Sequence, residues 1–289
     1  MSAICYLCGS GRRHRKEGRV RDAPELPIWE CEGCGLVSLG AGVGRDGDFY
    51  ADSGMHGSEA PDAQAWLRES ERDDRRRIAF LASRLAGSRL LDFGCGAGGF
   101  LAHAGALATS ATGIEPERRL AGHFRALGLT VHSDLGALPE DSRFDLITAF
   151  HVIEHLADPR EILRRLAARL ADSRSGLIVE VPAATDALLS LYRSSSFSNF
   201  TYWSCHLYLF DASTLRRLAE QAGLRVDFIR QVQRYPLSNH LHWLAAGRPG
   251  GHRTWAFLDT PELERAYEST LASLGLCDTL IAGFALASE

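Results

Sequence analysis

The sequence predicts an α/β fold built on a doubly wound, mostly parallel sheet, and three observations carry this prediction. Residues 90–101 read LLDFGCGAGGFL, in which a short apolar run leads into a glycine-rich turn and then a helical pattern. From there on, short apolar strands alternate with helical segments, which is typical of a parallel sheet. The segment FDLITAF at 144–150 is apolar almost throughout, as a strand covered on both faces should be.

The glycine-rich turn indicates a ligand site. Gly94, Gly96 and Gly98 let the backbone turn tightly and let a ligand approach it, because they carry no Cβ. The N–H groups and the dipole of the following helix favour an anion there. Gly94, Gly96 and Gly99 also match the dinucleotide-binding pattern G-x-G-x-x-G, which is weak evidence on its own. Asp92 at the strand end would repel a pyrophosphate, so it favours a ligand with cationic groups.

Three further strands extend the pattern. Residues 111–115 (ATGIE) end in Glu115, 23 residues after Asp92, where an acid can accept hydrogen bonds from both ribose hydroxyls of a nucleoside. Residues 129–132 form a third candidate strand, followed by Asp134. The fourth strand, 144–150, runs into HVIEHLADP and so places His151 at the strand end, where open α/β sheets bind their ligands.

The run from Asp92 to Gly98 resembles the first motif of class I S-adenosylmethionine (SAM)-dependent methyltransferases, and HVIEHLADP is similar to their fourth motif. The resemblance covers roughly residues 75–235 and implies a Rossmann-like, seven-stranded sheet with SAM as cofactor. In that family an acid after the third strand usually faces the adenine amino group, a role implied here for Asp134. A Rossmann domain with another cofactor is the alternative. The predicted cofactor-binding residues are Asp92, Phe93, Gly94, Gly96, Gly98, Glu115, Pro116, Asp134, Leu135 and Phe150.

Two cysteine pairs near the N-terminus predict a zinc-ribbon-like module. Cys5 and Cys8 form one C-x-x-C pair and Cys31 and Cys34 the other, with 22 residues between the pairs and a glycine after each. Four thiolates at such spacing can hold Zn²⁺ tetrahedrally, and a closed site of this kind is structural because it leaves no open position for chemistry. The alternative is two incidental thiol pairs in a reduced protein.

Sequence signals predict further helices and strands along the rest of the chain. Residues 63–86 predict a helix that ends at Gly87, and Asp158 followed by Pro159 predicts the start of another. Residues 176–181 and 225–232 predict the fifth and sixth strands, and Asp211 or Ser213 begins the helix between them. Residues 233–243 read as strand-like. The tail at 260–288 reads as an amphipathic helix that either packs on the domain or pairs two subunits as a homodimer.

Two segments have competing interpretations. Residues 12–21 (RRHRKEGRVR) form either the solvated tip of a hairpin or a patch for phosphate groups. Residues 183–206 follow the fifth strand and mix Ser, Asn and aromatic residues. They form either a wall for a sugar or a ring, or a surface loop packed by its own aromatics. The predicted domains are a zinc-binding module (1–45), a linker or lid with a leading helix (46–87), a methyltransferase domain (88–250, with 183–206 as an acceptor-side insertion) and a helical extension (251–289).

The amino-acid composition limits the kinds of partner that we expect the protein to bind. The 289 residues carry a net charge of -4 and 24% charged residues, without the basic excess that nucleic-acid binding requires. The first residues lack the basic start and the apolar stretch of a signal peptide, and no run of about 18 apolar residues could span a bilayer. We therefore expect a cytoplasmic protein without a membrane partner, in which cysteines are thiols or metal ligands.

Histidines are the candidate catalytic residues. For a hydroxyl acceptor a general base adds perhaps 10²–10⁴-fold to the rate of methyl transfer, and His serves best near neutral pH. His151 follows the fourth strand, and His206 lies in WSCHLYLF, which is similar to a His-Leu-x-x-Phe run that lines the acceptor side in related enzymes. His155 is expected to brace its loop, and His240 is a further candidate.

The cysteine module joined to a class I domain resembles bacterial methyltransferases of glycan and natural-product pathways. This resemblance implies a small-molecule acceptor, methylated on a hydroxyl of a saccharide or natural-product intermediate. Three alternatives stay open. They are an RNA methyltransferase that grips RNA with its zinc module, a C-methyltransferase of a nucleotide-linked sugar, and a cofactor-binding regulatory protein without turnover.

Overall fold

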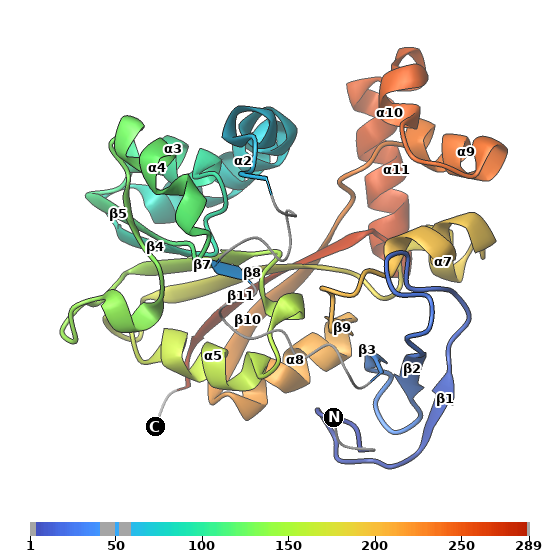
Figure 1. The fold of residues 1–289 in the computed structure, drawn as a ribbon, viewed down its shortest axis with the longest axis horizontal. Helices are drawn as coiled ribbons and strands as arrows, with labels where there is room; N and C mark the ends of the chain where they lie inside the picture. The colour runs from blue at the N-terminus through green and yellow to red at the C-terminus, as the bar shows by residue number, and fades with distance from the viewer. Residues whose placement is uncertain (1–3, 41–49, 52–58, 288–289) are drawn as a thin grey trace. The chain divides into compact units, whose positions relative to one another are not determined.

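The computed structural model describes residues 4–40, 50–51 and 59–287 (Figure 1). The chain divides into two compact units. Unit 1 comprises Met1–Gly44, Glu180–Leu218 and Phe228–Ala282, and unit 2 comprises Arg45–Val179, Ala219–Asp227 and Gly283–Glu289. Of the linker or lid predicted at the start of the 46–87 segment, residues 46–49 and 52–58 lie outside the described residues. Among the described helices, none is both long enough and apolar enough to cross a membrane.

The larger sheet has seven strands in the order β10-β11-β8-β7-β4-β5-β6, which confirms the predicted architecture. Unit 2 holds four parallel strands, β4 (Arg89–Phe93), β5 (Ser110–Ile114), β6 (Thr130–His132) and β7 (Leu146–Phe150). All five residues of β7 are buried, as its apolar sequence predicts. In the register of these strands Asp92 of β4 lies between Gly113 of β5 and Thr148 of β7.

The remaining strands of this sheet are β8 (Gly176–Pro182), β10 (Leu224–Val232) and β11 (Thr279–Leu286). β8 starts beside β7, because the Gly176 N–H donates to the Asp145 carbonyl at 3.0 Å. β11 starts where β8 ends, because the Ala183 N–H donates to the Asp278 carbonyl at 2.9 Å. The side chain of Gln233, at the end of β10, also contacts Asp278. β11 is therefore the antiparallel strand of a mostly parallel sheet.

Helices cover both faces of the unit 2 strands. Figure 1 shows α2 (Ala63–Leu85), α3 (Gly99–Gly105) and α4 (Ala121–Ala126) on one face and α5 (Pro159–Ala167) on the other. α5 begins as predicted, with Pro159 in its first turn and the Asp158 carboxylate accepting from the Glu161 N–H at 3.1 Å. Leu163 and Leu166 form its buried face. Short 3₁₀ helices η1 (Arg118–Leu120), η2 (Leu135–Ala137) and η3 (Ile153–His155) lie between these elements.

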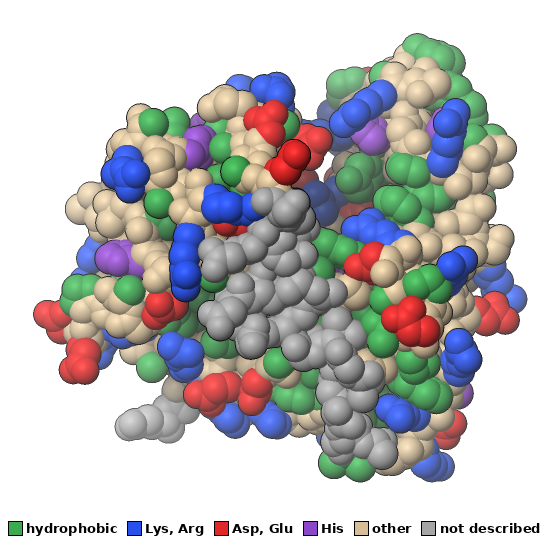
Figure 2. All heavy atoms as spheres, in the orientation of Figure 1, with side chains coloured by type: hydrophobic (Ala, Val, Ile, Leu, Met, Phe, Trp, Pro, Cys, Tyr) green, Lys and Arg blue, Asp and Glu red, His purple; other side chains and the backbone are tan. Residues whose placement is uncertain are grey.

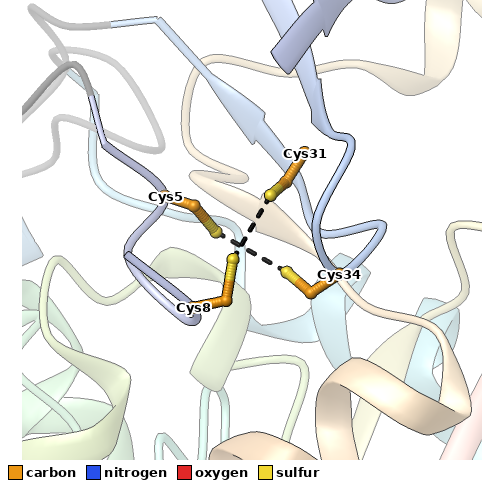
Figure 3. Close-up of side chains that lie close together, drawn as sticks. All are labelled: Cys5, Cys8, Cys31 and Cys34. Carbon is orange, nitrogen blue, oxygen red and sulfur yellow. Dashed lines mark hydrogen bonds between the residues drawn. The ribbon is translucent and has the colours of Figure 1, made fainter. Parts of the chain in front are cut away.

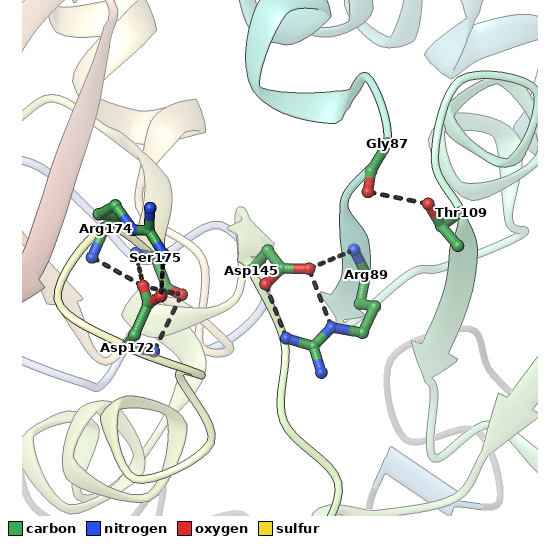
Figure 4. Close-up of polar contacts among 7 residues, drawn as sticks. All are labelled: Gly87, Arg89, Thr109, Asp145, Asp172, Arg174 and Ser175. Atoms are coloured by element: carbon green, nitrogen blue, oxygen red, sulfur yellow. Dashed lines mark hydrogen bonds and ion pairs between the residues drawn. The ribbon is translucent and has the colours of Figure 1, made fainter.

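The amino ends of β4 and β7 are joined by an ion pair (Figure 4). Arg89 Nε and Nη2 donate to the Asp145 carboxylate at 2.9 and 2.8 Å, and the Arg89 backbone N–H donates to it at 2.8 Å. The Arg89 side chain thereby lowers the pKa of Asp145 to about 2. Nearby, the Thr109 hydroxyl donates to the Gly87 carbonyl at 2.8 Å. These bonds fix the edge where the strands start, which leaves the edge where they end for ligands.

Unit 1 contains a second, antiparallel sheet of four strands, β1 (Arg13–Arg15), β2 (Ile28–Cys31), β3 (Val37–Leu39) and β9 (Tyr208–Leu209). β9 directly follows the 183–206 insertion, so the N-terminal strands and the end of the insertion share one sheet. Val20 and Ile28 pack with Tyr202 and Leu209 in a common buried cluster. The core of the N-terminal module is thus completed by residues that are distant in the sequence.

The insertion forms α6 (Ala187–Ser190) and α7 (Ser195–Thr201) and leads through β9 to α8 (Ala212–Gln221). Its aromatic residues pack within unit 1: the rings of Phe197 and Phe200 lie 5.2 and 5.0 Å from that of Trp243. The Arg21 guanidinium lies 5.2 Å from the Phe200 ring and 4.8 Å from that of Trp203. These aromatic side chains therefore pack against Trp243 and Arg21, and the contacts occupy one cation of the basic stretch 12–21.

Two predicted elements differ in the structure. The strand-like interpretation of residues 233–243 is wrong, because Leu237–Ala246 form helix α9 with His240 and His242 buried. A run this short fits both periods, and the buried side chains recur at helical spacing. The prediction of a helical tail is confirmed for α11 (Pro261–Leu274). It is wrong for β11, which is a strand inside the sheet. Gly275, with φ of 72°, ends α11 in the left-handed conformation. Helices α10 (Gly251–Thr254) and η4 (Ala256–Leu258) separate α9 from α11.

Candidate active site

The glycine-rich turn connects β4 to α3 in unit 2. Gly94, Gly96 and Gly98 have φ values of 77°, 53° and 82°, a left-handed region that favours glycine. A Cβ on Gly94 would lie 2.3 Å from Val152 Cγ2, and one on Gly96 would lie 2.7 Å from Trp66 Cζ2. Both the backbone conformation and the available space therefore require glycine at Gly94 and Gly96.

Two carboxyl groups flank this turn, that of the buried Asp92 and that of the half-buried Glu115. Asp92 accepts a hydrogen bond from the Thr148 hydroxyl at 2.7 Å, and Glu115 accepts one from the Gly96 N–H at 2.9 Å. Burial raises the pKa of Asp92 to about 7 and that of Glu115 to about 7. A ligand that brings a positive charge to Asp92 would stabilise its ionised form. Glu115, hydrogen-bonded to the turn itself, can accept hydrogen bonds from ribose hydroxyls. The two carboxyl groups therefore fit the cationic groups and the ribose of SAM.

Asp134 follows β6 and caps the next helical turn. Its Oδ1 accepts from the N–H groups of Gly136 and Ala137 at 2.7 and 3.2 Å, and its Oδ2 accepts from the Ser133 hydroxyl at 2.9 Å. The Ser133 hydroxyl and the Gly136 N–H lower the pKa of Asp134, which favours its ionised form. The other residues predicted to bind the cofactor also lie at or just after the ends of β4, β5, β6 and β7: Phe93, Pro116, Leu135 and Phe150.

Sequence reasoning missed a buried charged cluster on α2. Asp74 and Arg77 are only 3% and 7% exposed, and their side chains form an ion pair at 3.3 Å. The Ser70 hydroxyl donates to Asp74 at 2.7 Å. The Arg77 guanidinium lies 4.4 Å from the centre of the Phe150 ring, and its charge opposes the rise in the pKa of Asp92. Charged residues at helical spacing indicate a solvent-facing surface, so the sequence pattern conceals this cluster.

Replacing Arg77 with Ala should lower the free energy of unfolding by about 3–5 kcal/mol, because the buried Asp74 would lose its ionic partner. Urea denaturation followed by circular dichroism measures the change. The matched control is Arg75→Ala on the same helix, where the pair with Glu71 is exposed to solvent and contributes little to stability. Equal stability of the two variants would show that the buried pair does not hold α2 in place.

His151 follows β7 and has a φ of 56°, which is uncommon for a residue with a Cβ. Its Nδ1 lies 3.3 Å from Oε1 of Glu154, whose side chain is fully buried. With the ring proton on Nδ1, the nitrogen that faces this carboxylate, Nε2 is the basic nitrogen of the ring. His155, for which a bracing role is expected, lies on η3 together with Glu154. Its Nε2 is 4.0 Å from Glu154 Oε1. Glu154 was not among the predicted site residues, although its spacing from His151 in HVIEH could have indicated the pair.

His206 lies in the turn before β9 and belongs to unit 1, whereas His151 belongs to unit 2. The His206 N–H donates to the Trp203 carbonyl at 2.8 Å, and the two rings lie 5.4 Å apart. The two histidines predicted to be catalytic are therefore held by separate compact units. His240 also lies in unit 1, on the buried side of α9.

The four cysteines predicted to bind metal converge in unit 1 (Figure 3). The sulfurs of Cys5 and Cys34 are 3.6 Å apart, those of Cys8 and Cys31 are 3.4 Å apart, and all four lie within 4.8 Å of one another. Zn–S bonds of about 2.3 Å in a tetrahedron put sulfurs about 3.8 Å apart, so four sulfurs this close together could hold such an ion. The glycines after the two pairs have φ values of 73° and 78°, so each pair ends in a left-handed turn.

Comparison with known proteins identifies the family. A family model described as a methyltransferase domain matches residues 65–227, more than half of the chain. A ubiquinone biosynthesis O-methyltransferase of Coxiella burnetii is 29% identical over 167 residues, which cover 54% of this chain and 71% of that protein. The protein of the same description from Bordetella pertussis is 34% identical over 97 residues, which cover 30% of this chain and 40% of that protein.

Solved structures share the fold at low sequence identity. A SAM-dependent methyltransferase from Archaeoglobus fulgidus gives a TM-score of 0.53 at 21% identity, covering 76% of this chain and 99% of that one. Magnesium protoporphyrin IX methyltransferase from Synechocystis, with bound SAH, gives a TM-score of 0.51 at 13% identity, covering 83% and 97%. Together with the family match, the seven-stranded sheet and the glycine turn between Asp92 and Glu115 show that the chain belongs to the methyltransferase-domain family and is a class I SAM-dependent methyltransferase.

Proposed function

We propose that the protein transfers the methyl group of SAM to a hydroxyl of a small molecule, a saccharide or natural-product intermediate. The observation that carries this proposal is the pair formed by His151 and the buried Glu154 at the end of β7. A hydroxyl is a weak nucleophile and needs a base, which an imidazole oriented by a carboxylate provides. The curated relatives are described as O-methyltransferases of ubiquinone biosynthesis, which supports oxygen as the methylated atom.

In this proposal each residue around the turn has a separate role. SAM supplies a methyl group that its sulfonium already activates. Asp92 holds the cationic part of the cofactor, Glu115 binds the ribose hydroxyls and Asp134 accepts from the adenine amino group. His151 Nε2 takes the proton of the acceptor hydroxyl, and Glu154 stabilises the imidazolium that forms. Alignment of the reacting groups can contribute on the order of 7–11 kcal/mol to such a displacement.

We also propose that the four-cysteine cluster binds a structural Zn²⁺. All four donors are protein thiols at tetrahedral spacing, so the ion would have no open position for a substrate. Cys31 is the last residue of β2, in the sheet that β9 shares with the N-terminal strands, and we infer that the site holds the 183–206 insertion in shape for the acceptor. His206, at the end of that insertion, stays a proposed acceptor-side residue.

A small molecule is favoured over RNA as the acceptor. The net charge is -4, and Figure 2 shows Lys and Arg side chains interspersed with Asp and Glu over the visible face. A protein that binds an RNA backbone needs several cations gathered on one surface.

Methyl transfer to a panel of acceptors tests the proposal. The protein is incubated with methyl-labelled SAM and either nucleotide sugars, free saccharides, phenols, polyketide-like alcohols or bulk RNA, and products are analysed by mass spectrometry and NMR. We expect a methoxy product from one of the small-molecule classes. Label found in RNA, or on carbon or nitrogen of the small molecules, would contradict the assignment.

SAM should bind more tightly at pH 8 than at pH 6. The pKa of Asp92 and that of Glu115 are about 7 in the free protein, so both carboxyls largely carry protons at pH 6. The ionised forms bind the cofactor, so binding releases protons, and the affinity should rise by up to about tenfold per pH unit for each linked carboxyl below that pKa. Calorimetry in buffers with different ionisation enthalpies counts the protons released.

Asp92→Asn provides the control for this measurement, because it should weaken binding and remove part of the pH dependence. An affinity that stays constant from pH 6 to 8 in the unsubstituted protein would show that these carboxyls do not contact the cofactor.

The same raised pKa values also affect the stability of the folded protein. Because the folded state binds more protons than the unfolded chain between pH of about 4 and 7, stability of the cofactor-free protein should fall as pH rises through this window.

A further inference from the structure

The basic stretch 12–21 has no role in the mechanism above. It holds six cations and one acid, Glu17, whereas the whole chain carries a net charge of -4. Two of the cations have partners in unit 1. Arg21 stacks on aromatic rings, and Lys16 Nζ lies 2.5 Å from the Glu30 carboxylate. Among the described residues no carboxylate pairs with the guanidinium groups of the other four, which are all exposed: Arg12, Arg13, Arg15 and Arg19.

Two of these arginines share one face of the antiparallel sheet. β1 is an edge strand of that sheet (Figure 1), and its register sets Arg13 opposite Cys31 and Arg15 opposite Trp29. Because side chains alternate between the faces of a strand, Arg13, Arg15 and Trp29 lie on the same face. Ile28, next to Trp29, points to the opposite face and joins the buried cluster there. The Arg13 guanidinium lies 4.3 Å from the centre of the Trp29 ring, which restrains one of the two cations.

The backbone of β1 also leaves hydrogen-bonding groups at the open edge of the sheet. The Lys16 N–H donates to the Ile28 carbonyl at 2.9 Å. In an antiparallel pair, residues that bond the neighbouring strand alternate with residues whose backbone groups point away from it. The N–H and C=O groups of Arg13 and Arg15 therefore point away from β2. Among the described residues no strand lies on that side, because β1 is at the end of the strand order.

These backbone groups favour a peptide over a phosphate as the ligand. Arg13 and Arg15 each present a carbonyl oxygen beside the N–H at the edge, and these oxygens would repel a phosphate. An extended peptide can pair with both kinds of group, because its own N–H and C=O alternate in the same way. Alternate residues of a strand are about 7 Å apart, so acidic side chains at alternate positions of the peptide would each meet one arginine.

A second copy of β1 is a poor partner for this edge. It would bring arginines opposite arginines, and like charges directly opposite one another destabilise a pair of strands. Charged side chains on edge strands prevent unwanted pairing between sheets in this way. The same charges admit a strand of opposite charge.

We propose that β1 is a docking edge for an extended acidic segment of a partner protein. The segment adds a fifth strand to the four-stranded sheet, beside β1. It carries Asp or Glu at alternate positions, so that its carboxylates pair with Arg13 and Arg15 while its backbone pairs with theirs. All the residues of this surface belong to unit 1, and the proposal does not depend on which molecule is methylated.

Hydrogen exchange tests the open edge without any partner. In the full-length protein, NMR should show faster exchange for the amides of Arg13 and Arg15 than for that of His14. His14 lies opposite Glu30, in a pair that bonds β2. Slow exchange at Arg13 and Arg15 would show that the edge is already covered and would overturn the proposal.

Binding of designed peptides tests the class of partner. Fluorescence polarisation on the full-length protein compares a short peptide in which glutamate alternates with threonine, its lysine counterpart, and an isomer with the glutamates in one block. The alternating acidic peptide should bind at least about tenfold more tightly than the lysine peptide, and about two- to fivefold more tightly than the block isomer. Equal binding of the two acidic isomers, preference for lysine, or no binding overturns the proposal.

Charge reversal tests the role of the two arginines. Arg13→Glu combined with Arg15→Glu should reverse the preference, so that the lysine peptide binds more tightly than the alternating acidic one. The matched control is Arg216→Glu combined with Arg217→Glu, because these exposed arginines of unit 1 lie outside the basic stretch. The control changes the net charge equally and should keep the original preference. A preference that survives reversal at β1, or that the control also reverses, contradicts docking at this edge.

Two further sets of probes separate backbone pairing from simple charge attraction. Methylating the backbone nitrogens along one edge of the acidic peptide should abolish binding, and methylating those along the other edge should preserve it. Equal effects of the two methylations overturn strand addition. Binding of pyrophosphate or poly-uridine RNA to the β1 arginines, without binding of the acidic peptide, would assign the surface to phosphate instead. These measurements involve no methyl transfer, so failure of the proposed O-methylation would leave their outcome unchanged.

Discussion

Loss of the four-cysteine metal site should unfold much of unit 1 in addition to its first 40 residues. Zn²⁺ binding to a site of this kind contributes on the order of 10–16 kcal/mol in isolated zinc peptides at pH 7, comparable to the entire stability of a small domain. The module shares a buried cluster with Tyr202 and Leu209, and Ser204 donates two hydrogen bonds to Asp22. The insertion should therefore lose its order together with the metal.

The measurement combines metal analysis with limited proteolysis. We expect one zinc per chain in the purified protein, and rapid cleavage within 183–206 after chelation or in Cys31→Ser. Cys205→Ser is the matched control, because Cys205 is a buried thiol of the same unit that lies outside the cluster. A metal-free protein as resistant to protease as the zinc-bound one would show that the cluster does not support the insertion.

Replacing His151 with Ala should reduce kcat by about 10²–10⁴-fold with little change in affinity for SAM, because the proposed base would be lost and the glycine turn kept. Turnover is measured at saturating SAM and acceptor across pH. Glu154→Gln should give a smaller loss, because an amide can still orient the ring but cannot stabilise its charged form. The acidic limb of the pH profile should also move in this variant.

His103→Ala is the matched control for that experiment. His103 lies on α3 in the same unit and pairs with Glu71 at the surface, so its removal should leave turnover unchanged. Wild-type turnover of His151→Ala at saturating acceptor would exclude His151 as the base. His206 would then be the next residue to replace.

The features that the sequence predicts well are local. Asp158 followed by Pro159 marks a helix start through its own capping bond, and the glycine turn is required by conformations within a few residues. The cysteine spacing likewise identifies two knuckles, each of which is a short turn. In these cases the residues that form the pattern also form the contact.

The features that the sequence does not predict depend on distant partners. The apolar strand β11 is indistinguishable from a buried helix until β8 and β10 are known to flank it. Asp74 and Arg77 are ordinary surface residues by pattern, and they are buried by the packing of α2 against α3 and of Arg77 over Phe150. The pairing of Val37 with Leu209 joins residues too far apart for any local signal to reveal it.

That last pairing sets an order of events during synthesis. The knuckle cysteines are within 29 residues of one another, so the nascent module can capture its metal as soon as Cys34 leaves the ribosome. Leu209 follows Val37 by 172 residues, which at about 5–20 residues per second corresponds to a delay of about 9–34 s. Throughout that interval β3 has an open edge and its apolar face is uncovered. Early capture of the proposed Zn²⁺ would therefore hold the first three strands together until the fourth strand arrives.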